Sequence, residues 1–289
     1  MKVSGFTFIR NAIKFDYPVT ESIRSILPIC DDFYVAVGNS DDDTLGVVQS
    51  LDPKIEIIET VWDESLINGG VVFARETDKA FKMVPEDSDW CFYLQGDEVI
   101  HEKYLDTIKE EMLRWMDNRE VDGLLFNFLH FYGSYDYIAT SHRWYRKEIR
   151  VIRNDQSIYS YRDAQGFRKG NNSKLKVKPI DAWVYHYGWV KHPETQMHKR
   201  RNFHSLYQEN VHKYTDILEA DEFDYGTIDA LKMFTGTHPK AIQDKIDKMN
   251  WKFDYDLSLN KMNLKYKLKA WAEKHFGFIP GEYRNYKII

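Results

Sequence analysis

An acidic turn follows an apolar segment near the middle of the chain. Residues 90–94 read Trp-Cys-Phe-Tyr-Leu, which is typical of a buried strand, and Gln95, Gly96, Asp97 and Glu98 come directly after them. In a parallel α/β sheet, ligands bind just outside the carboxyl ends of the strands. A carboxylate at such an end can hold a divalent cation or a ribose hydroxyl, because hard cations prefer oxygen ligands. Asp97 is therefore the first candidate metal ligand. Alternatively, Asp97 or Glu98 caps the following helix.

A histidine near the end of a later strand is the second candidate ligand. Residues 183–189 read Trp-Val-Tyr-His-Tyr-Gly-Trp, so His186 ends an apolar run and Gly188 follows it. A glycine lets the backbone approach a ligand closely, because it has no Cβ. We expect His186 to complete the coordination of a cation held by Asp97. A histidine flanked by aromatic residues can equally have a structural role.

Cationic side chains on two expected helices could bind phosphate. Arg75 lies on a helix that follows a Gly-Gly pair, and its planar guanidinium can form two parallel hydrogen bonds to phosphate oxygens. The alternative is a surface arginine paired with Glu76 or Asp78. The run 199–201, Lys-Arg-Arg, could also neutralise a diphosphate, but we expect it to form a solvated basic face.

The elements that must position these residues alternate between strands and helices over the first 130 residues. Apolar runs predict the strands, and apolar residues at spacings of three and four predict the helices. Strands alternating with helices imply right-handed crossovers and a doubly wound, mostly parallel sheet, hence the α/β class. The expected strands are 3–9, 33–37, 54–60 and 90–94, and the expected helices are 20–27, 44–51, 71–84 and 102–116.

Beyond Gly123 the pattern changes to a mixed α+β half. This change places a soft boundary near residue 120, and the expected divisions are 1–120, 121–210 within the same domain, and a C-terminal helical extension, 211–289. The expected strands of this part are 124–131, 148–153 and 182–187, and its expected helices are 194–207, 239–250 and 261–275.

The last of these helices is amphipathic and basic. Within 261–275, Leu264, Leu268 and Trp271 alternate with five lysines. A basic amphipathic helix can lie on an anionic membrane surface as a peripheral contact. It can equally cover the domain core with its apolar residues while its lysines face solvent, and we expect this second arrangement.

Composition excludes some classes of function. The chain has 40 basic and 45 acidic side chains, a net charge of -5, which argues against nucleic acid as a partner, since phosphate binding needs clustered Lys and Arg. Cys30 and Cys91 lie in apolar runs, so we expect reduced thiols in a cytoplasmic protein. The first residues lack the apolar stretch of a signal peptide, and no window resembles a membrane span. We therefore expect a cytoplasmic protein, at most peripheral to the inner face of a membrane.

Four motifs follow one another along the chain: Phe8-Ile9-Arg10-Asn11, Val37-Gly38-Asn39-Ser40-Asp41-Asp42-Asp43-Thr44, Gly69-Gly70 with Phe73-Ala74-Arg75, and Leu94-Gln95-Gly96-Asp97-Glu98. Their succession resembles that of the family-two glycosyltransferases, whose domain has the GT-A fold. The likeness runs from residue 1 to about residue 207. Gln95 replaces the first Asp of the family's Asp-x-Asp metal motif, and Asn39 stands near where the family often has a base-reading Asp.

The resemblance implies an inverting transferase that moves a sugar from a UDP- or GDP-type nucleotide diphosphate sugar to a hydroxyl of a carbohydrate or glycolipid acceptor. Asp97 and His186 would hold Mn²⁺ or Mg²⁺, because a cation stabilises the charge that builds on the diphosphate leaving group. Alternatively, the chain is a catalytically degenerate relative that binds nucleotide but has lost sugar transfer, and Gln95 in place of the first Asp reflects that lost activity. The residues assigned to the nucleotide are Arg10, Asn11, Asn39, Asp41, Arg75 and Gln95.

Inverting transfer also needs a general base for the acceptor hydroxyl. Asp163 is the first choice, because it follows an aromatic loop and precedes the strand of His186; Asp136 is the second. Either residue can instead cap a loop. Trp144 and Tyr145 could stack on the acceptor sugar or pack against the sheet. In these terms, 1–120 is the nucleotide-sugar-binding half and 121–210 the acceptor half.

Overall fold

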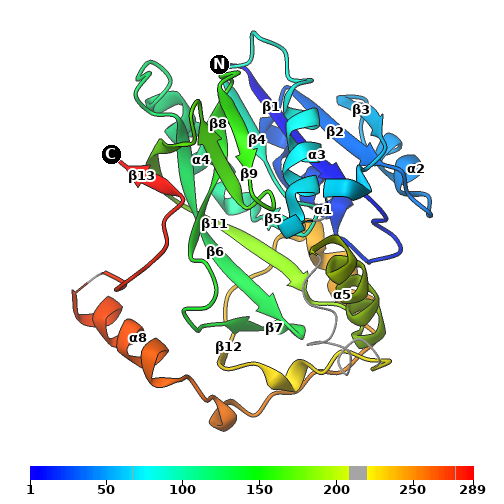
Figure 1. Cartoon of the computed structure of the whole chain (residues 1–289), viewed down its shortest axis with the longest axis vertical. Helices are drawn as coiled ribbons and strands as arrows, with labels where there is room; N and C mark the ends of the chain where they lie inside the picture. Colours follow the sequence, from blue (N-terminus) through cyan, green and yellow to red (C-terminus); the bar gives the residue numbers. More distant parts are fainter. Residues whose placement is uncertain (67, 208–219, 277) are drawn as a thin grey trace.

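The structure, a computed structural model, describes residues 1–66, 68–207, 220–276 and 278–289. Its strands form one sheet, with further short strands paired at its margins. The order in the sheet is β3 (Ile55–Thr60), β2 (Asp32–Gly38), β1 (Val3–Ile9), β4 (Trp90–Tyr93), β8 (Lys147–Arg153), β6 (Gly123–Tyr132), β11 (Ser173–Trp189), β10 (Gly166–Lys169) and β9 (Ile158–Tyr161). Helices pack on both faces of the first half of this sheet (Figure 1). The predicted α/β fold class is confirmed.

The first half of the sheet is parallel. β1 (Val3–Ile9) lies between β2 (Asp32–Gly38) and β4 (Trp90–Tyr93), and β3 (Ile55–Thr60) extends the sheet beyond β2. The apolar residues of β1, β2 and β4 are buried on both faces, as is typical of parallel strands covered by crossover helices. Each predicted strand of this half is present, with ends within one residue of those expected.

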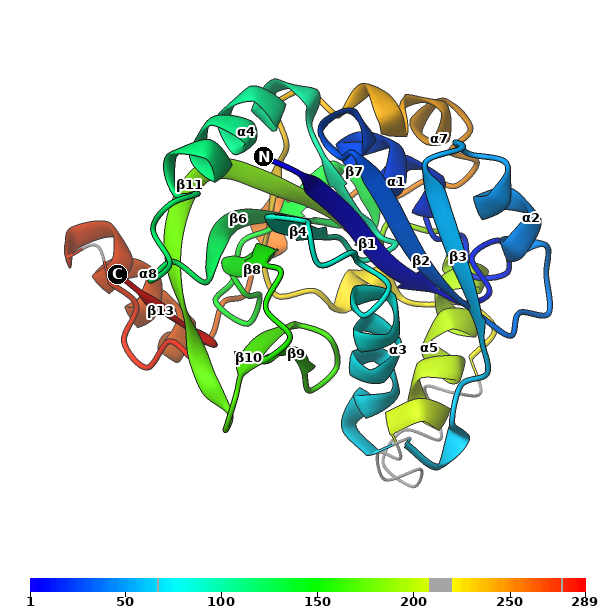
Figure 2. The same cartoon turned by 90° about the horizontal axis from the view of Figure 1, so that it is seen from above.

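Two helical layers cover this parallel half. α1 (Val19–Ile26), α2 (Thr44–Gln49) and α4 (Leu105–Arg114) share one apolar core with the inward residues of one face, such as Phe33 and Val35. α3 (Val71–Phe81) packs on the other face, against Phe6 and Tyr93 (Figure 2). The predicted helices are confirmed, and the sheet is doubly wound.

The second half mixes strand directions. β8 (Lys147–Arg153) pairs antiparallel with both β4 and β6 (Gly123–Tyr132), and β6 pairs parallel with β11 (Ser173–Trp189). The strand expected at 182–187 is therefore the end of a much longer one. The remaining strands have no counterpart in the predicted set: β5 (Glu98–Ile100), β7 (Ser134–Ala139), β9 (Ile158–Tyr161), β10 (Gly166–Lys169), β12 (Leu231–Met233) and β13 (Tyr286–Ile288).

Among the described residues, three α-helices come after β11. α5 (Pro193–Tyr207), α7 (Gln243–Asp247) and α8 (Leu264–Phe276) correspond to the three helices expected there, although α7 is shorter than expected. No helix among the described residues is long and apolar enough to cross a membrane. Short 3₁₀ turns complete the structure at Leu27–Ile29, Glu64–Leu66, Asn68–Gly70, Glu102–Tyr104, Tyr225–Thr227, Lys240–Ile242 and Leu257–Leu259.

Candidate active site

A cavity of about 960 Å³ lies outside the carboxyl ends of β1 and β4. Ligand pockets for cofactor-sized molecules measure roughly 300–1,000 Å³, so the cavity can hold a nucleotide together with a second molecule's reacting group. Both halves of the sheet, α5 and the C-terminal residues 279–286 contribute to its lining.

Asp97 lines this cavity from the turn between β4 and β5. Its carbonyl accepts a hydrogen bond of 2.8 Å from Tyr187 N–H, because β5 pairs with β11. Its Oδ2 lies 3.2 Å from Lys199 Nζ, and its Oδ1 lies 3.8 Å from His186 Nε2. Burial alone would raise the pKa of this carboxyl, but Lys199 and, to a smaller degree, His186 and Lys191 lower it to about 2. Asp97 is therefore a buried but ionised carboxylate.

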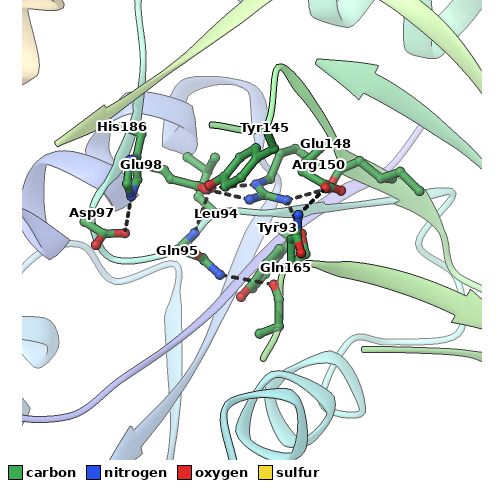
Figure 3. A network of polar contacts seen from close by, with 12 residues as sticks. Tyr93, Leu94, Gln95, Asp97, Glu98, Tyr145, Glu148, Arg150, Gln165 and His186 are labelled. Atoms are coloured by element: carbon green, nitrogen blue, oxygen red, sulfur yellow. Dashed lines mark hydrogen bonds and ion pairs between the residues drawn. The ribbon is translucent and has the colours of Figure 1, made fainter. Parts of the chain in front are cut away.

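The Nε2 of His186 faces Asp97 (Figure 3). The Nε2 of His130 lies 2.7 Å from the carbonyl oxygen of Tyr145, which can only accept, so this nitrogen carries the proton. Burial lowers the pKa of His130 well below its ordinary value, so its Nδ1 is bare and accepts from His186 Nδ1–H at 3.0 Å. Burial likewise lowers the pKa of His186, and its Nε2 is left as an acceptor.

Asp97 Oδ1 and His186 Nε2 are thus two acceptors that face each other across 3.8 Å. Such a pair suits a cation that takes one oxygen and one imidazole ligand, and Mn²⁺ accepts imidazole more readily than Mg²⁺ does. Within the described residues, no group of three or more His, Cys, Asp or Glu side chains could hold a metal. A cation here would therefore take its other ligands from substrate oxygens or water.

Lys199 overturns the expectation of a solvated basic face for 199–201. The residue is 9% exposed, and its ammonium donates to Asp97 Oδ2 at 3.2 Å and to the Gly188 carbonyl at 3.1 Å. Gly188 is required by space: a Cβ there would lie 2.6 Å from Asp97 Oδ2 and 2.7 Å from His186 Nε2. The end of β11 and the start of α5 therefore pack tightly around the carboxylate.

Glu98 is part of the support beneath the site. It is fully buried and forms two hydrogen bonds, of 2.5 and 2.6 Å, with the buried guanidinium of Arg150 (Figure 3). Its Oε2 also accepts the Gln95 N–H at 3.2 Å. The alternative that Asp97 or Glu98 caps the next helix is wrong, because His101 accepts the N–H of Lys103 at that helical start.

Gln95 connects this turn to the proposed base. Its side-chain amide donates to the carbonyl of Ala164 at 3.1 Å, and both Gln95 and Asp163 line the cavity. The flanking residues Arg162 and Ala164 have φ values of 58° and 62°, an uncommon left-handed conformation for non-glycine residues. The turn between β9 and β10 therefore holds Asp163 in a constrained loop over the cavity.

Glu148, on β8, is a cavity residue that we did not predict. Its Oε1 accepts from Gln165 Nε2 at 2.8 Å, and its Oε2 has no hydrogen-bond partner among the described residues. The side chain is 3% exposed, and burial raises its pKa to about 8 despite the nearby Arg150. Glu148 thus holds a proton at neutral pH.

Aromatic rings form the wall beside β1. Phe8 stacks on Phe73 with ring centroids 5.9 Å apart, and Trp62 meets Phe73 edge-on at 5.5 Å. The guanidinium of Arg10 lies 5.3 Å from the Trp62 ring, while the buried Trp62 Nε1 has no hydrogen-bond partner among the described residues. Flat rings and a cation are suited to a heteroaromatic base, whereas the Trp62 Nε1 is enclosed beside Gly38, where a Cβ would lie 2.3 Å from it.

Four residues assigned to the nucleotide lie outside the lining of this cavity. The side-chain carbonyl of Asn11 accepts from Asp41 N–H at 2.7 Å, and that of Asn39 accepts from Trp62 N–H at 3.2 Å, so both organise loops. Asp41 pairs with Lys14 at 2.7 Å on the surface, and Arg75 is exposed on α3. Of the six residues assigned to the nucleotide, the geometry brings Arg10 and Gln95 to the cavity.

Asp136, the second choice for the base, is exposed on β7 and is not among the residues that line the cavity.

Three functional side chains that were either missed from the sequence or expected on the surface share one property. His130, Glu148 and Lys199 are polar residues whose burial depends on partners more than ten positions away. A weak signal exists for Glu148, since it is a charged residue at the start of an apolar strand. Lys199 carries no such signal, because a basic run on a helix is typical of a surface.

Comparisons with known proteins give weak likeness to solved structures. No family model and no curated protein matches the chain. TarS from S. aureus is 17% identical, with a TM-score of 0.39, over 76% of this chain; the chain spans 40% of TarS. Glucosyl-3-phosphoglycerate synthase from Mycobacterium tuberculosis, in complex with Mn²⁺, UDP and phosphoglyceric acid, is 13% identical, with a TM-score of 0.30, over 45% of this chain and 43% of its own. 4-Diphosphocytidyl-2C-methyl-D-erythritol synthase from Anaerococcus prevotii is 12% identical, with a TM-score of 0.38, over 66% of this chain and 91% of its own.

Proposed function

We propose that the chain is a glycosyltransferase that takes its sugar from a nucleotide diphosphate sugar. One observation carries the proposal: an ionised carboxylate, an imidazole acceptor and an ammonium group meet in a large cavity at the carboxyl end of β4. Cleavage of the anomeric C–O bond leaves negative charge on the diphosphate, and such a site is suited to stabilise it.

The aromatic wall supports the assignment of a nucleotide donor. A base stacked beside Trp62 and Phe73 would place the diphosphate toward Asp97, because these rings and the carboxylate line one cavity. Arg10 would contact the base or ribose, and Gln95 the ribose or sugar. UDP and GDP are both compatible with rings that stack without reading a base edge.

Lys199 and a divalent cation would share the diphosphate charge. Asp97 and His186 are the residues that would hold Mn²⁺, which supplies Lewis-acid stabilisation of the leaving group when bound. Lys199 would bind a phosphate oxygen from the other side of the carboxylate, and its contact with Asp97 fixes its place before the donor arrives.

The acceptor hydroxyl would lose its proton to Asp163 as it attacks the anomeric carbon from the face opposite the diphosphate, which inverts the configuration. Trp144 and Tyr145 line the same cavity and offer ring faces to an acceptor sugar. Glu148 is protonated at neutral pH, so it would donate to a ligand oxygen rather than act as the base.

The test is calorimetry and turnover with UDP- and GDP-sugars, with Mn²⁺ or with EDTA. We expect one nucleotide to bind, and Asp97→Asn to lower donor hydrolysis by roughly 10²–10³-fold while unfolding stays cooperative. Asp41→Asn, an exposed acid outside the cavity, is the matched control. Binding without hydrolysis or transfer would instead favour a degenerate nucleotide-binding protein, and unchanged turnover in Asp97→Asn would exclude the mechanism.

A further inference from the structure

The outer face of α8 is an apolar stripe in contact with solvent. Leu264 is 73% exposed, Leu268 58% and Trp271 54%. These residues are spaced by four and three positions, so they lie on one side of the helix. Phe276, whose ring centroid lies 5.3 Å from that of Trp271, and Phe278, 6.3 Å from Phe276, add exposed rings at the end of the helix, with exposures of 61% and 51%. We call these five residues the α8 stripe.

The opposite side of α8 is already occupied. Ala272 is buried, Glu273 pairs with His142 at 2.9 Å and with Arg146 at 3.6 Å, and Lys269 lines the cavity. These contacts fix which way the helix faces, so the stripe cannot be turned inward without breaking them. The expectation that this helix covers the core with its apolar residues is therefore wrong for the stripe.

The charge around the stripe is opposite to that of the whole chain. Residues 261–276 hold five lysines and one glutamate, whereas the chain has a net charge of -5. On a helical projection Lys267 and Lys274 lie on one flank of the stripe and Lys265 on the other, and Lys261 lies just before the helix. α8 lies at the edge of the molecule in both views (Figures 1 and 2), so its exposed side can meet a flat surface.

We propose that the α8 stripe docks the protein on an anionic lipid bilayer. The apolar side chains would enter the boundary between headgroups and acyl chains, with Trp271 at the interface, and the flanking lysines would lie at the level of the anionic headgroups. A second copy of the chain fits less well, because a two-fold contact through the stripe would bring the lysine flanks of both copies together.

The bilayer would also meet the wall of the cavity. Lys269 lies on α8 itself, and Ile279 and Tyr283 follow in the next residues; all three line the cavity. This part of the inference rests on the proposed function, since it implies that an acceptor carried by a lipid can reach Asp163 from the membrane surface.

Vesicle sedimentation tests the docking without any substrate. We expect the full chain to bind vesicles of phosphatidylcholine with phosphatidylglycerol, to bind phosphatidylcholine alone weakly, and to dissociate at high salt. Leu268→Ser with Trp271→Ser should abolish binding. Lys265→Gln with Lys267→Gln should weaken it by roughly fivefold for each lysine. Leu113→Ser, which changes a 51% exposed leucine on α4, should bind as the wild type does.

Two results would overturn the docking: equal binding by the Leu268→Ser/Trp271→Ser variant, or no binding to anionic vesicles at low salt. If light scattering shows that the wild type is a dimer and this variant a monomer, and the wild type does not bind vesicles, the stripe would be a self-association surface instead. Hydrolysis of a soluble donor by the same variant should equal that of the wild type, because neither residue lines the cavity. Docking and the proposed transfer can therefore fail separately.

Discussion

The bare Nε2 of His186 depends on a residue that touches no expected ligand. His130 accepts the Nδ1–H of His186 because its own Nε2–H is held by the Tyr145 carbonyl. Without that acceptor, the proton on Nδ1 of His186 can move to Nε2, so that His186 presents a donor to Asp97. A partner of this kind typically changes metal affinity by about 10–100-fold when it is removed.

We therefore expect His130→Phe to weaken Mn²⁺-dependent nucleotide binding by about 10–100-fold, whereas His130→Gln, which offers a carbonyl acceptor, should retain more of it. Calorimetry measures the affinity, and ¹⁵N shifts of the His186 ring report the tautomer. If His130→Phe keeps both the tautomer of His186 and the wild-type nucleotide affinity, His130 contributes to packing and does not set the tautomer.

Gly188 gives a second prediction at the residue scale. Gly188→Ala would push a methyl group against Asp97 and His186, since the new Cβ would lie 2.6 and 2.7 Å from their polar atoms. We expect nucleotide binding to fall below detection while thermal unfolding remains cooperative. Gly236→Ala crowds the Phe234 ring at 2.7 Å outside the cavity lining, and it should bind nucleotide normally.

The pairing of β5 with β11 is the element that brings Asp97 to His186, and the Glu98–Arg150 ion pair joins β5 to β8. Both partners are fully buried, so removing one leaves a charge without compensation. Arg150→Met should lower the free energy of unfolding by about 3–5 kcal/mol, as measured by urea denaturation. Glu98→Leu combined with Arg150→Met should cost clearly less than the single change. If the double variant instead loses as much free energy of unfolding as the two single variants together, the Glu98–Arg150 pair does not contribute to stability as a unit.

The long parallel strands and the helices of the first half could be predicted, because their apolar runs and spacings exceed what chance produces. β5 could not, since it has three residues, one of them a glutamate, and its partner lies more than eighty positions later. We predicted that Asp97 and His186 would meet because both lie near strand ends, and the family resemblance favoured the same pair; their side chains do lie 3.8 Å apart. The inward turn of Lys199 depends on how α5 rotates, which no local pattern specifies.

At the scale of the whole molecule, Glu148 should make global stability depend on pH. Its pKa rises from an ordinary 4.5 to about 8 in the folded protein, so the folded state binds a proton that the unfolded state releases. The stabilisation of the folded state by this bound proton is complete below about pH 4.5 and is lost as the pH rises through about 8. Its loss should amount to several kcal/mol at most.

Urea denaturation at a series of pH values measures this effect. Glu148→Gln, which is neutral at every pH, should flatten the decline of wild-type stability across that window. Glu110→Gln, at an exposed position on α4, should follow the wild-type curve. Parallel curves for wild type and Glu148→Gln would mean that Glu148 ionises as an ordinary surface acid does.

β11 has a kinetic consequence. One end of this 17-residue strand pairs with β13, and the other pairs with β5 and carries His186. Closing contacts between segments so distant in the chain is slow. The acid and both imidazoles can come together only after β11 has paired with β5 and β6, so the rate at which refolding chains regain nucleotide binding would report the formation of these pairings.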